Sequence, residues 1–536
     1  MKEMIDYDVI IIGSGMGGLH AGIYLQGKNP ALRTLIVEKN RYPGGYVSGF
    51  TNRGFYFDSA AEGMLDVENS RAYKAIQEFG FKQKFHKMKT NQAYYINDKK
   101  FNMYSDFEKF LDEIKIQHPD QVEGVKSLFD TCHEIKSEIE QCGLFESKIT
   151  FGKVLKVIFK YKTLRKYARK SFKDLLDEFI TDKQLFEYFN LFCLWFGLKF
   201  EEIDAPVAAV ILSSAFTKGI QYPNGGMGTF ALNLVKQYEA TGGTLKYRTT
   251  VKKIVVKRNV VKGVELEDGT LVKSKYVISN GDLYKTVFDY VGKNHFRKRY
   301  LSRIQKLRKS ISGYMMYLGL EDIDLSEYPA HFIIGKNSDI VPKVRNEHID
   351  LESVGVRISS NIDPSQKNGS KTSLIVLGFA NKKWNNNWNT GNSKKKPIEY
   401  RELKKNVMQK LISKIEKIIP NISRHISLKR LATPFTFERF NLSSEGAWYG
   451  PEWNQKLPKF KSPIKNLFFA GSNVSGGGVT TAMHSGLTTG KFLLKKIEKD
   501  YLKKSFYPVF SKDTIIAASE VLTDLLQESL DGKKKK

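Results

Sequence analysis

Three glycines near the start of the chain have the spacing of a phosphate-binding turn. Gly13, Gly15 and Gly18 form a GxGxxG pattern directly after the apolar run Val9–Ile12. In such a pattern the first glycine permits a tight turn, the second lets the backbone approach a pyrophosphate, and the third lets a helix lie close to the strand. The N-terminus of that helix offers free N–H groups and the positive end of its dipole to a phosphate. The spacing therefore predicts phosphate binding at this turn.

The elements that must position these glycines can also be predicted from the sequence. The β-branched run Val9–Ile12 is typical of a buried parallel strand, and the apolar spacing from Leu19 to Leu25 indicates a helix. A second apolar strand, Leu35–Val37, ends at Glu38, about twenty residues after the last glycine, where an acid can accept hydrogen bonds from a ribose. The complete strand–turn–helix–strand–acid unit predicts a dinucleotide-binding site.

The stretch after this acid indicates which dinucleotide is bound. Lys39–Phe50 resembles the second glycine motif of the FAD-dependent amine-oxidase-like superfamily, in which paired glycines, here Gly44 and Gly45, let the chain pass close to the flavin. Arg53–Asp58 is similar to the next block of the branch that contains phytoene desaturases, carotenoid isomerases and retinol saturases. The resemblance implies FAD as the cofactor.

Later blocks follow in the same order. Tyr222–Asp282 resembles the middle of this branch, where the residue matching Val251 offers its backbone to the adenine. Gly446–Gly450 resembles a block beside the flavin and the substrate cavity. Asn466–Val479 resembles the last block, whose glycine-rich loop leads into a helix expected over Thr480–Leu494, with its N-terminus at the N1/O2 edge of the flavin. Ser472 stands where the family often has an acid, so its contact with the cofactor is less well defined by the resemblance.

The fingerprint and the resemblance together imply one set of FAD-binding positions. These are Gly13, Ser14, Gly15, Gly17, Gly18, Glu38, Lys39, Arg41, Gly44, Gly45, Tyr46, Val47, Ser48, Val251, Asn280, Gly471, Ser472, Gly478 and Val479.

Catalytic residues are not defined by the sequence. Tyr449, His484 and Asn473 are the candidates near the flavin, and none is assigned a proton-transfer role, because hydride transfer to a polyene need not use a strong base. The other histidines considered, His20, His133 and His331, are expected to be structural.

The expected fold is of the α/β class, with a doubly wound, Rossmann-type FAD-binding domain interleaved with a substrate domain that contains a mixed sheet. The FAD-binding domain is expected to combine residues 1–100, 215–300 and 458–500, and the substrate domain to span residues 301–457. Residues 101–214 read as a helical insertion with a potential membrane-facing surface, and residues 501–536 as a C-terminal helix with a basic tail. Strands are expected at Ser312–Gly319 and Thr372–Phe379, and an exposed loop at Lys382–Lys396.

The composition limits the cellular compartments and the binding partners that we expect for this protein. The three cysteines have no metal-ligand or disulfide spacing, so we expect no metal site and a reducing compartment. No secretory signal and no spanning helix are expected. The net charge of +29 favours an anionic partner, and the absence of any nucleic-acid-binding motif argues against nucleic acid. A cytoplasmic protein with peripheral membrane contact is therefore expected, although a lysine-rich genomic bias would produce the same charge.

The prediction of membrane contact rests on one segment of the chain. Phe151–Phe172 alternates lysines and arginines with apolar and aromatic residues, as an interfacial helix does. The alternative is a surface helix that packs its apolar face on its own domain.

Several functions remain open at this stage. The first is an FAD-dependent oxidoreductase that desaturates or saturates a C–C bond of an apolar isoprenoid, such as a carotenoid or retinoid. The alternatives are a carotenoid cis-trans isomerase that uses FAD, an amine oxidase of the same superfamily, and a non-catalytic, membrane-associated flavoprotein. No second glycine fingerprint is found for a nicotinamide cofactor, so the electron donor or acceptor is left open.

Overall fold

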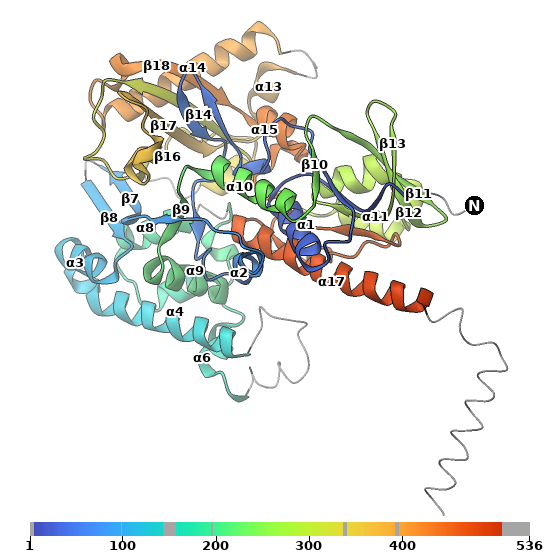
Figure 1. Cartoon of the computed structure of the whole chain (residues 1–536). Helices are drawn as coiled ribbons and strands as arrows, with labels where there is room; N and C mark the ends of the chain where they lie inside the picture. Colours follow the sequence, from blue (N-terminus) through green and yellow to red (C-terminus); the bar gives the residue numbers. More distant parts are fainter. Residues whose placement is uncertain are drawn as a thin grey trace, which may run out of the picture.

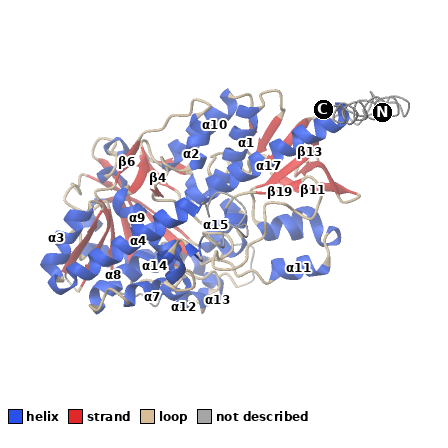
Figure 2. Ribbon diagram, turned by 90° about the horizontal axis from the view of Figure 1, so that it is seen from below, coloured by secondary structure: helices blue, strands red, loops and turns tan. Residues whose placement is uncertain are grey.

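Two seven-stranded sheets form the framework of the molecule (Figure 1). A computed structural model of the chain describes residues 5–97, 99–142, 157, 159–193, 197–335, 340–391 and 396–505. The helical insertion lies at the opposite end of the molecule from strands β11 and β13 in both views (Figures 1 and 2).

The first sheet contains the predicted dinucleotide-binding strands. Its parallel part has the order β10 (Thr244–Lys246), β2 (Thr34–Val37), β1 (Tyr7–Ile12), β13 (Leu271–Ser279) and β19 (Leu467–Phe469). Strands β12 (Val260–Leu266) and β11 (Val251–Lys257) continue from β13 as an antiparallel meander. This arrangement confirms the predicted α/β fold with a Rossmann-type parallel sheet.

The apolar run in β1 is explained by burial of both faces of the sheet. Val9 and Ile11 pack toward α1 (Met16–Lys28), whereas Ile10 and Ile12 pack toward β11, β12 and their neighbours on the other face. Because side chains alternate along a strand, only a continuous apolar run can fill both sides.

Two helices from opposite ends of the chain lie side by side on this sheet. Helix α1 follows the glycine turn, and α17 (Val479–Ser505) follows the last glycine-rich loop (Figures 1 and 2). Helix α17 contains the predicted helix Thr480–Leu494 and continues beyond it. The contact brings the first and last predicted FAD motifs together.

The second sheet separates the cavity described below from a covering helix. Its order is β18 (Ile426–Ala432), β14 (Gly313–Glu321), β17 (Lys371–Phe379), β16 (Val354–Ile358), β15 (His331–Ile334), β7 (Thr90–Ile96) and β8 (Lys99–Tyr104). Strands β14 and β17 pair antiparallel and match the two strands predicted there. Met316 and Val376 face helix α14 (Ile398–Glu416), whereas Met315 and Leu377 face away from it.

The domain boundaries stay a prediction. The hairpin of β7 and β8 crosses the expected boundary at residue 100, and β7 pairs in parallel with β15 of the second sheet.

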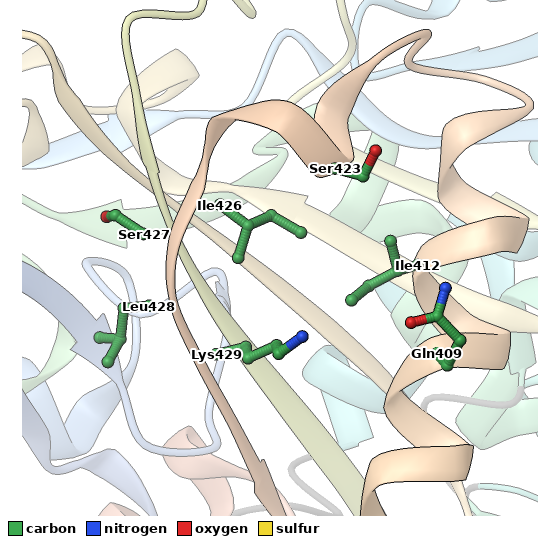
Figure 3. A pocket seen from close by; sticks show the side chains of 7 residues that line it. All are labelled: Gln409, Ile412, Ser423, Ile426, Ser427, Leu428 and Lys429. Atoms are coloured by element: carbon green, nitrogen blue, oxygen red, sulfur yellow. The ribbon is translucent and has the colours of Figure 1, made fainter.

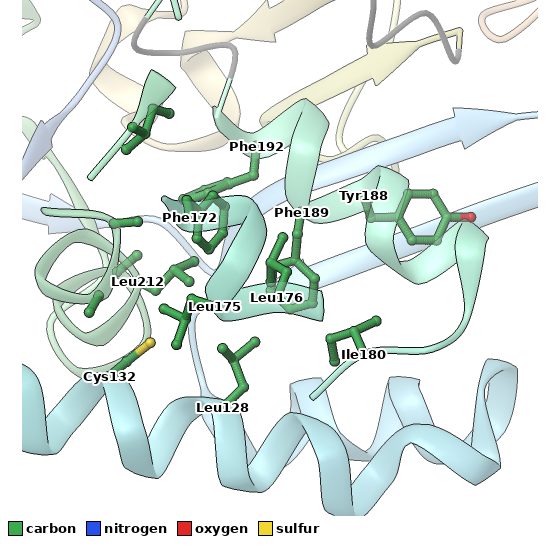
Figure 4. Packing of buried hydrophobic residues seen from close by; sticks show 14 of the residues in the cluster. Leu128, Cys132, Phe172, Leu175, Leu176, Ile180, Tyr188, Phe189, Phe192 and Leu212 are labelled. Atoms are coloured by element: carbon green, nitrogen blue, oxygen red, sulfur yellow. The ribbon is translucent and has the colours of Figure 1, made fainter. Parts of the chain in front are cut away.

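A cluster of aromatic and aliphatic side chains holds the helical insertion together (Figure 4). Its helices include α3 (Phe107–Gln117), α4 (Val122–Cys142), α7 (Phe172–Asp177), α8 (Lys183–Cys193) and α9 (Ala205–Thr217). Figure 4 shows Leu128 and Cys132 of α4 facing Leu175, Leu176 and Leu212 from the helices above. Cys132 and Cys142 are buried free thiols, and burial raises the pKa of Cys132.

The basic segment Phe151–Phe172 is not one continuous helix, and this prediction was wrong. Residues 151–156 and 158 lie outside the described residues, but the chain leaves the helical conformation at Tyr161 and again between α6 (Lys162–Tyr167) and α7. Ser171 begins α7 with a capping box, which stops a helix from running through it. The apolar residues Leu164, Tyr167 and Phe172 are buried in the insertion's own cluster.

The expected exposed loop at Lys382–Lys396 also differs. Residues 392–395 lie outside the described part, but Asn385–Asn389 form a left-handed helical turn with φ values between 48° and 59°. Asparagine tolerates this conformation better than most residues. Trp388 is fully buried and its Nε1 donates to the carbonyl of Asn381 at 3.1 Å, so the turn has a packed core.

The C-terminal helix and basic tail predicted within residues 501–536 lie outside the described residues beyond Ser505. Among the described helices, none is long and apolar enough to cross a membrane.

Candidate flavin and substrate cavity

One cavity of about 1080 Å³ connects the glycine loops with the helical insertion and the second sheet. All but four of the predicted FAD-binding residues line it, and so do the three candidates Tyr449, His484 and Asn473. Residues far apart in the sequence therefore meet at one place, as the order of the motifs predicted. The volume exceeds the several hundred Å³ that one small ligand usually needs.

The four exceptions have other contacts. Ser14 is buried against Glu38 and Gly18 lies beneath the turn, where a Cβ would come within 2.2 Å of the carbonyl oxygen of Gly13. Arg41 is exposed and its guanidinium lies over the ring of Tyr42. The Ser48 hydroxyl hydrogen-bonds that of Ser59 at 2.7 Å. Ser14 and Gly18 shape the turn, whereas Arg41 is not among the residues that line the cavity.

The glycine turn has no room for side chains. A Cβ on Gly15 would lie 2.7 Å from the side-chain nitrogen of Asn280, and one on Gly17 would lie 2.5 Å from the side-chain oxygen of that residue. Gly13 has a φ of 90°, a conformation that favours glycine. Because Gly13, Gly15 and Gly17 also line the cavity, their backbone is open to the close approach of a phosphate at the N-terminus of α1.

Glu38 supports the turn from the end of β2. One of its carboxylate oxygens accepts hydrogen bonds from the backbone N–H and the hydroxyl of Ser14, at 3.0 and 2.7 Å. The other oxygen accepts from the backbone N–H of Asn40 at 2.8 Å. A carboxylate has about four lone-pair positions, so capacity remains for a ribose hydroxyl. Glu38 thus has a role in the fold besides the predicted contact.

The second glycine motif lies directly against the first. The backbone N–H of Gly44 donates to the carbonyl of Ser14 at 3.0 Å, and Gly44 and Gly45 both have positive φ values. Tyr46 is anchored by its hydroxyl, which donates to the carbonyl of Ala447 at 2.7 Å. Lys39 donates to the carbonyl of Arg439, and burial lowers its pKa.

The last glycine-rich loop closes the same region. Gly471, Gly476 and Gly478 have positive φ values, and the loop contains a short helix, α16 (Ser472–Ser475), before α17 begins. The side chain of Asn473 donates to the carbonyl of Gly281 at 2.7 Å and accepts from the N–H of Leu283 at 3.1 Å. This candidate therefore connects two loops.

The other two candidates remain in the cavity wall. Tyr449 packs on Gly477, where a Cβ would come within 2.6 Å of its side chain, and burial raises its pKa. Burial, together with the positive charges of Arg71 and Lys491, lowers the pKa of His484 and favours its neutral form. His20 and His133 each hydrogen-bond a backbone carbonyl one turn earlier, as expected of structural histidines.

Away from the glycine loops the cavity wall is mostly apolar. Helices of the insertion and strands of the second sheet supply this wall. Its residues include Ile139, Leu191, Phe192, Val207, Val210, Ile211, Met315, Ile333, Leu377, Phe379, Trp448 and Trp453. Such a surface excludes water and suits a hydrocarbon ligand.

The sequence did not single out Glu62 or His331 as site residues, yet both line the cavity. Glu62 is 6% and His331 3% exposed, and Nε2 of His331 lies 3.5 Å from a carboxylate oxygen of Glu62. Burial raises the pKa of Glu62 to about 7, and burial with the charge of Arg357 lowers the pKa of His331 to about 3. The only local signal was an acid within the otherwise apolar stretch Ala60–Leu65.

The donor set fits FAD. Backbone N–H groups at a helix N-terminus suit a pyrophosphate, a carboxylate at the end of β2 suits a ribose, and Gly15 and Gly17 line the cavity at a place where a Cβ on either would clash with Asn280. The two loops around Tyr46 and Val479 would hold the flavin end.

A second pocket, of about 200 Å³, lies between α14 and β18 (Figure 3). It is lined by Gln409, Ile412, Ser423 and their neighbours, and none of the predicted site residues is among them. We assign it no function.

Comparisons with known proteins were made for the whole chain. The sequence model of a family described as flavin-containing amine oxidoreductase matches residues 16–491. Prolycopene isomerase 1, chloroplastic, of an Oncidium hybrid cultivar is 27% identical over 516 residues, which cover 91% of this chain and 84% of that protein. The all-trans-retinol 13,14-reductase of Danio rerio is 22% identical over 538 residues, with 92% and 86% covered. The crystal structure of an oxidoreductase from Methanosarcina mazei has a similar fold, with a TM-score of 0.60, 16% identity, and 90% and 100% of the two chains covered.

Proposed function

The chain belongs to the family of flavin-containing amine oxidoreductases and is an FAD-dependent oxidoreductase, and we propose that its substrate is an apolar isoprenoid with conjugated double bonds. The resemblance inferred from the motifs is confirmed by these matches. The observation that carries the substrate proposal is the apolar part of the cavity, which continues without interruption from the glycine loops.

The cavity favours a hydrocarbon over a polar molecule. Its wall beyond the glycine loops consists largely of aliphatic and aromatic side chains from α8, α9, β15 and β17. Transfer of an apolar surface from water to such a wall is favourable by about 25 cal/mol per Å². The relatives' names, a prolycopene isomerase and a retinol reductase, refer to polyene substrates and support the same class.

The residues of the chain would position FAD and the substrate and shield both from water. FAD, when bound, supplies or accepts a hydride at a substrate carbon. Glu38 and the glycine turn would hold the nucleotide end, and the Tyr46 loop and the first turn of α17 the flavin end. The apolar wall would align the polyene along the flavin and exclude water, which protects a reduced cofactor and a reactive substrate.

Whether the C–C bond is saturated or desaturated depends on the substrate and on the electron donor or acceptor. We propose saturation or desaturation of a C–C bond as the first function. Cis-trans isomerisation with no net redox change is the second, favoured by the match to a prolycopene isomerase over 91% of the chain.

Membrane contact is part of the proposal, because an isoprenoid dissolves in lipid rather than in water. Phe159 is 77% exposed and lies beside Lys160 on the insertion, and the chain carries a net charge of +29. Lys166 and Lys170 both form ion pairs with Glu178, so they are poor probes of lipid binding. Phe159→Asp should weaken flotation with anionic vesicles, whereas Ile116→Asp, at an equally exposed site on α3, should not.

Product analysis tests the proposed function. The FAD-loaded protein, oxidised or reduced, is incubated without oxygen with a carotenoid, a retinoid or an aliphatic diamine. The masses of the products are then measured by mass spectrometry. We expect an isoprenoid to gain or lose two hydrogens, or to change its geometry at constant mass. Reaction of the diamine alone would contradict the substrate proposal.

A further inference from the structure

We propose that the carboxyl group of Glu62, held in place by His331, donates and accepts the proton that accompanies hydride transfer at the substrate carbons. The inference rests on the proposed function, because it requires a C–C bond as the reacting group. The sequence alone assigned no residue a proton-transfer role, and the inference supplies one.

Glu62 lies between the two loops that would hold the flavin end of FAD. The N–H of its neighbour Ala61 donates to the carbonyl of Tyr46 at 2.9 Å. A few residues later, the carbonyl of Leu65 accepts from the hydroxyl of Thr480 in the first turn of α17, at 3.3 Å. The whole stretch from Ala60 to Asp66 lines the cavity. A substrate carbon close to the flavin would therefore lie close to this stretch.

One carboxyl oxygen of Glu62 is available for a ligand. Its Oε1 is buried and has no hydrogen-bond partner among the described residues, whereas Oε2 faces Nε2 of His331 at 3.5 Å. A buried polar atom that lines a cavity and lacks a partner is costly in a merely structural role. His331 is fixed within β15, and its neighbour in the sheet, Arg357 of β16, is fully buried.

Burial keeps the proton on Glu62. Arg357 lowers and Asp58 raises its pKa, but burial is the larger cause, and the pKa rises to about 7. The hydroxyls of Tyr317 on β14 and Tyr449 also lie in its field, and burial keeps both neutral. Because the pKa of His331 falls to about 3, the imidazole does not take the proton. A pKa near the working pH suits a group that both gives and takes a proton.

The proposed step balances for saturation of a double bond. The π bond breaks, one carbon accepts a hydride from reduced FAD, and the other accepts the proton of the Glu62 carboxyl. The hydride would carry both electrons from reduced FAD to the substrate, and the carboxylate regains a proton from water when the product leaves. Desaturation is the reverse, with the Glu62 carboxylate as the base. Addition and loss of the same proton without net hydride transfer would allow rotation about the bond.

The test compares Glu62→Gln with Glu140→Gln, since Glu140 also lines the cavity but is exposed. Both variants should retain FAD. Infrared titration of the FAD-loaded resting protein should show a protonated carboxyl band that disappears as pH rises through about 7. The band should be weaker in Glu62→Gln than in the wild type and unchanged in Glu140→Gln, because the buried carboxyl of Asp350, whose pKa is also raised to about 7, contributes the part that remains. Absence of this band from the wild type, or its persistence at full strength in Glu62→Gln, would overturn the proposal.

Single-turnover saturation in D₂O is the second measurement. The product of the wild type should carry two solvent deuteriums, one from the Glu62 carboxyl and one from the exchangeable N5–H of reduced FAD, and Glu62→Gln should react at least about 100-fold more slowly. Glu62→Asp, which keeps the carboxyl group, should restore part of the rate and its pH dependence if Glu62→Gln folds poorly. Equal rates in wild type and Glu62→Gln would reject proton transfer by Glu62 but not the proposed function. A wild type that transforms no polyene would reject both.

Discussion

The carbonyl oxygen of Gly17 in α1 lies 2.2 Å from the position that a Cβ atom on Gly486 of α17 would occupy. The two helices can therefore approach closely only because residue 486 has no side chain. This contact fixes the first glycine turn relative to the last glycine-rich loop, and the predicted cofactor would lie between them.

Gly486→Ala should destabilise the protein by about 1–3 kcal/mol, because the added methyl group forces the two helices apart. Gly490→Ala is the matched control, since its Cβ would meet the nearest atom, on Tyr24, at 3.3 Å. Alanine also favours the helix over glycine, which offsets part of the cost at residue 490. Thermal unfolding of both variants should show the lower melting temperature for Gly486→Ala, and equal melting temperatures would contradict this prediction.

Gly15→Val should abolish FAD retention while the protein still folds. The new side chain would enter the space facing Asn280, where even a Cβ lies within 2.7 Å of the side-chain nitrogen. Gly281→Ala serves as the control, because the nearest atom to its Cβ is at 3.8 Å. The flavin-to-protein absorbance ratio after purification is the measurement. Full FAD occupancy in Gly15→Val would show that the phosphate site is elsewhere.

Glu38→Ala should weaken FAD binding by about 1–3 kcal/mol, the cost of leaving buried polar partners without hydrogen bonds. It should also lower the melting temperature, because the N–H groups of Ser14 and Asn40 lose their acceptor. A fluorescence titration with FAD gives the affinity. Ser14→Ala, which keeps the carboxylate, should lose less, and unchanged affinity in Glu38→Ala would argue against the ribose contact.

Stability should depend on pH through Glu62. Its folded-state pKa, raised to about 7 from 4.5, means that the folded protein keeps a proton that the unfolded chain releases. This contribution is complete below the unfolded pKa and is lost as pH rises through the folded pKa, at up to about 1.4 kcal/mol per pH unit. Relative to wild type, Glu62→Gln should therefore gain stability from about pH 4.5 to 7. A constant difference in unfolding free energy over this range would contradict the burial effect.

The sequence predicted the strands, the turn and the helix around the first glycine motif well, because these elements depend on local patterns. The strand Val9–Ile12, its glycine turn and Glu38 form one continuous unit whose chemistry fixes the spacing. The paired glycines and the last loop followed from the family resemblance. Their approach within one cavity is a consequence of the parallel order of β1, β13 and β19.

The substrate end could not be predicted in the same way. Glu62, His331 and Ile211 come from a loop, a strand and a helix that meet only in the folded protein. His331 was expected to be structural because an isolated histidine carries no information about its neighbours. The basic segment is not the one continuous helix that was predicted, because the capping box at Ser171 starts a new helix within it. Apolar residues that alternate with lysines fit a membrane surface and the protein's own core equally well, so the pattern alone does not separate the two.

The central claim is that FAD and an isoprenoid share one cavity, and an anaerobic titration of the flavin absorbance tests it most directly. Wild type, Ile211→Trp in the cavity wall, and Leu232→Trp at a 43% exposed site on α10 (Met227–Ala240) are titrated with the reactive polyene. All three should bind FAD. The flavin spectrum should change in the wild type and in Leu232→Trp but not in Ile211→Trp. A wild-type flavin that responds to no polyene, or an equal response in Ile211→Trp, would contradict the account.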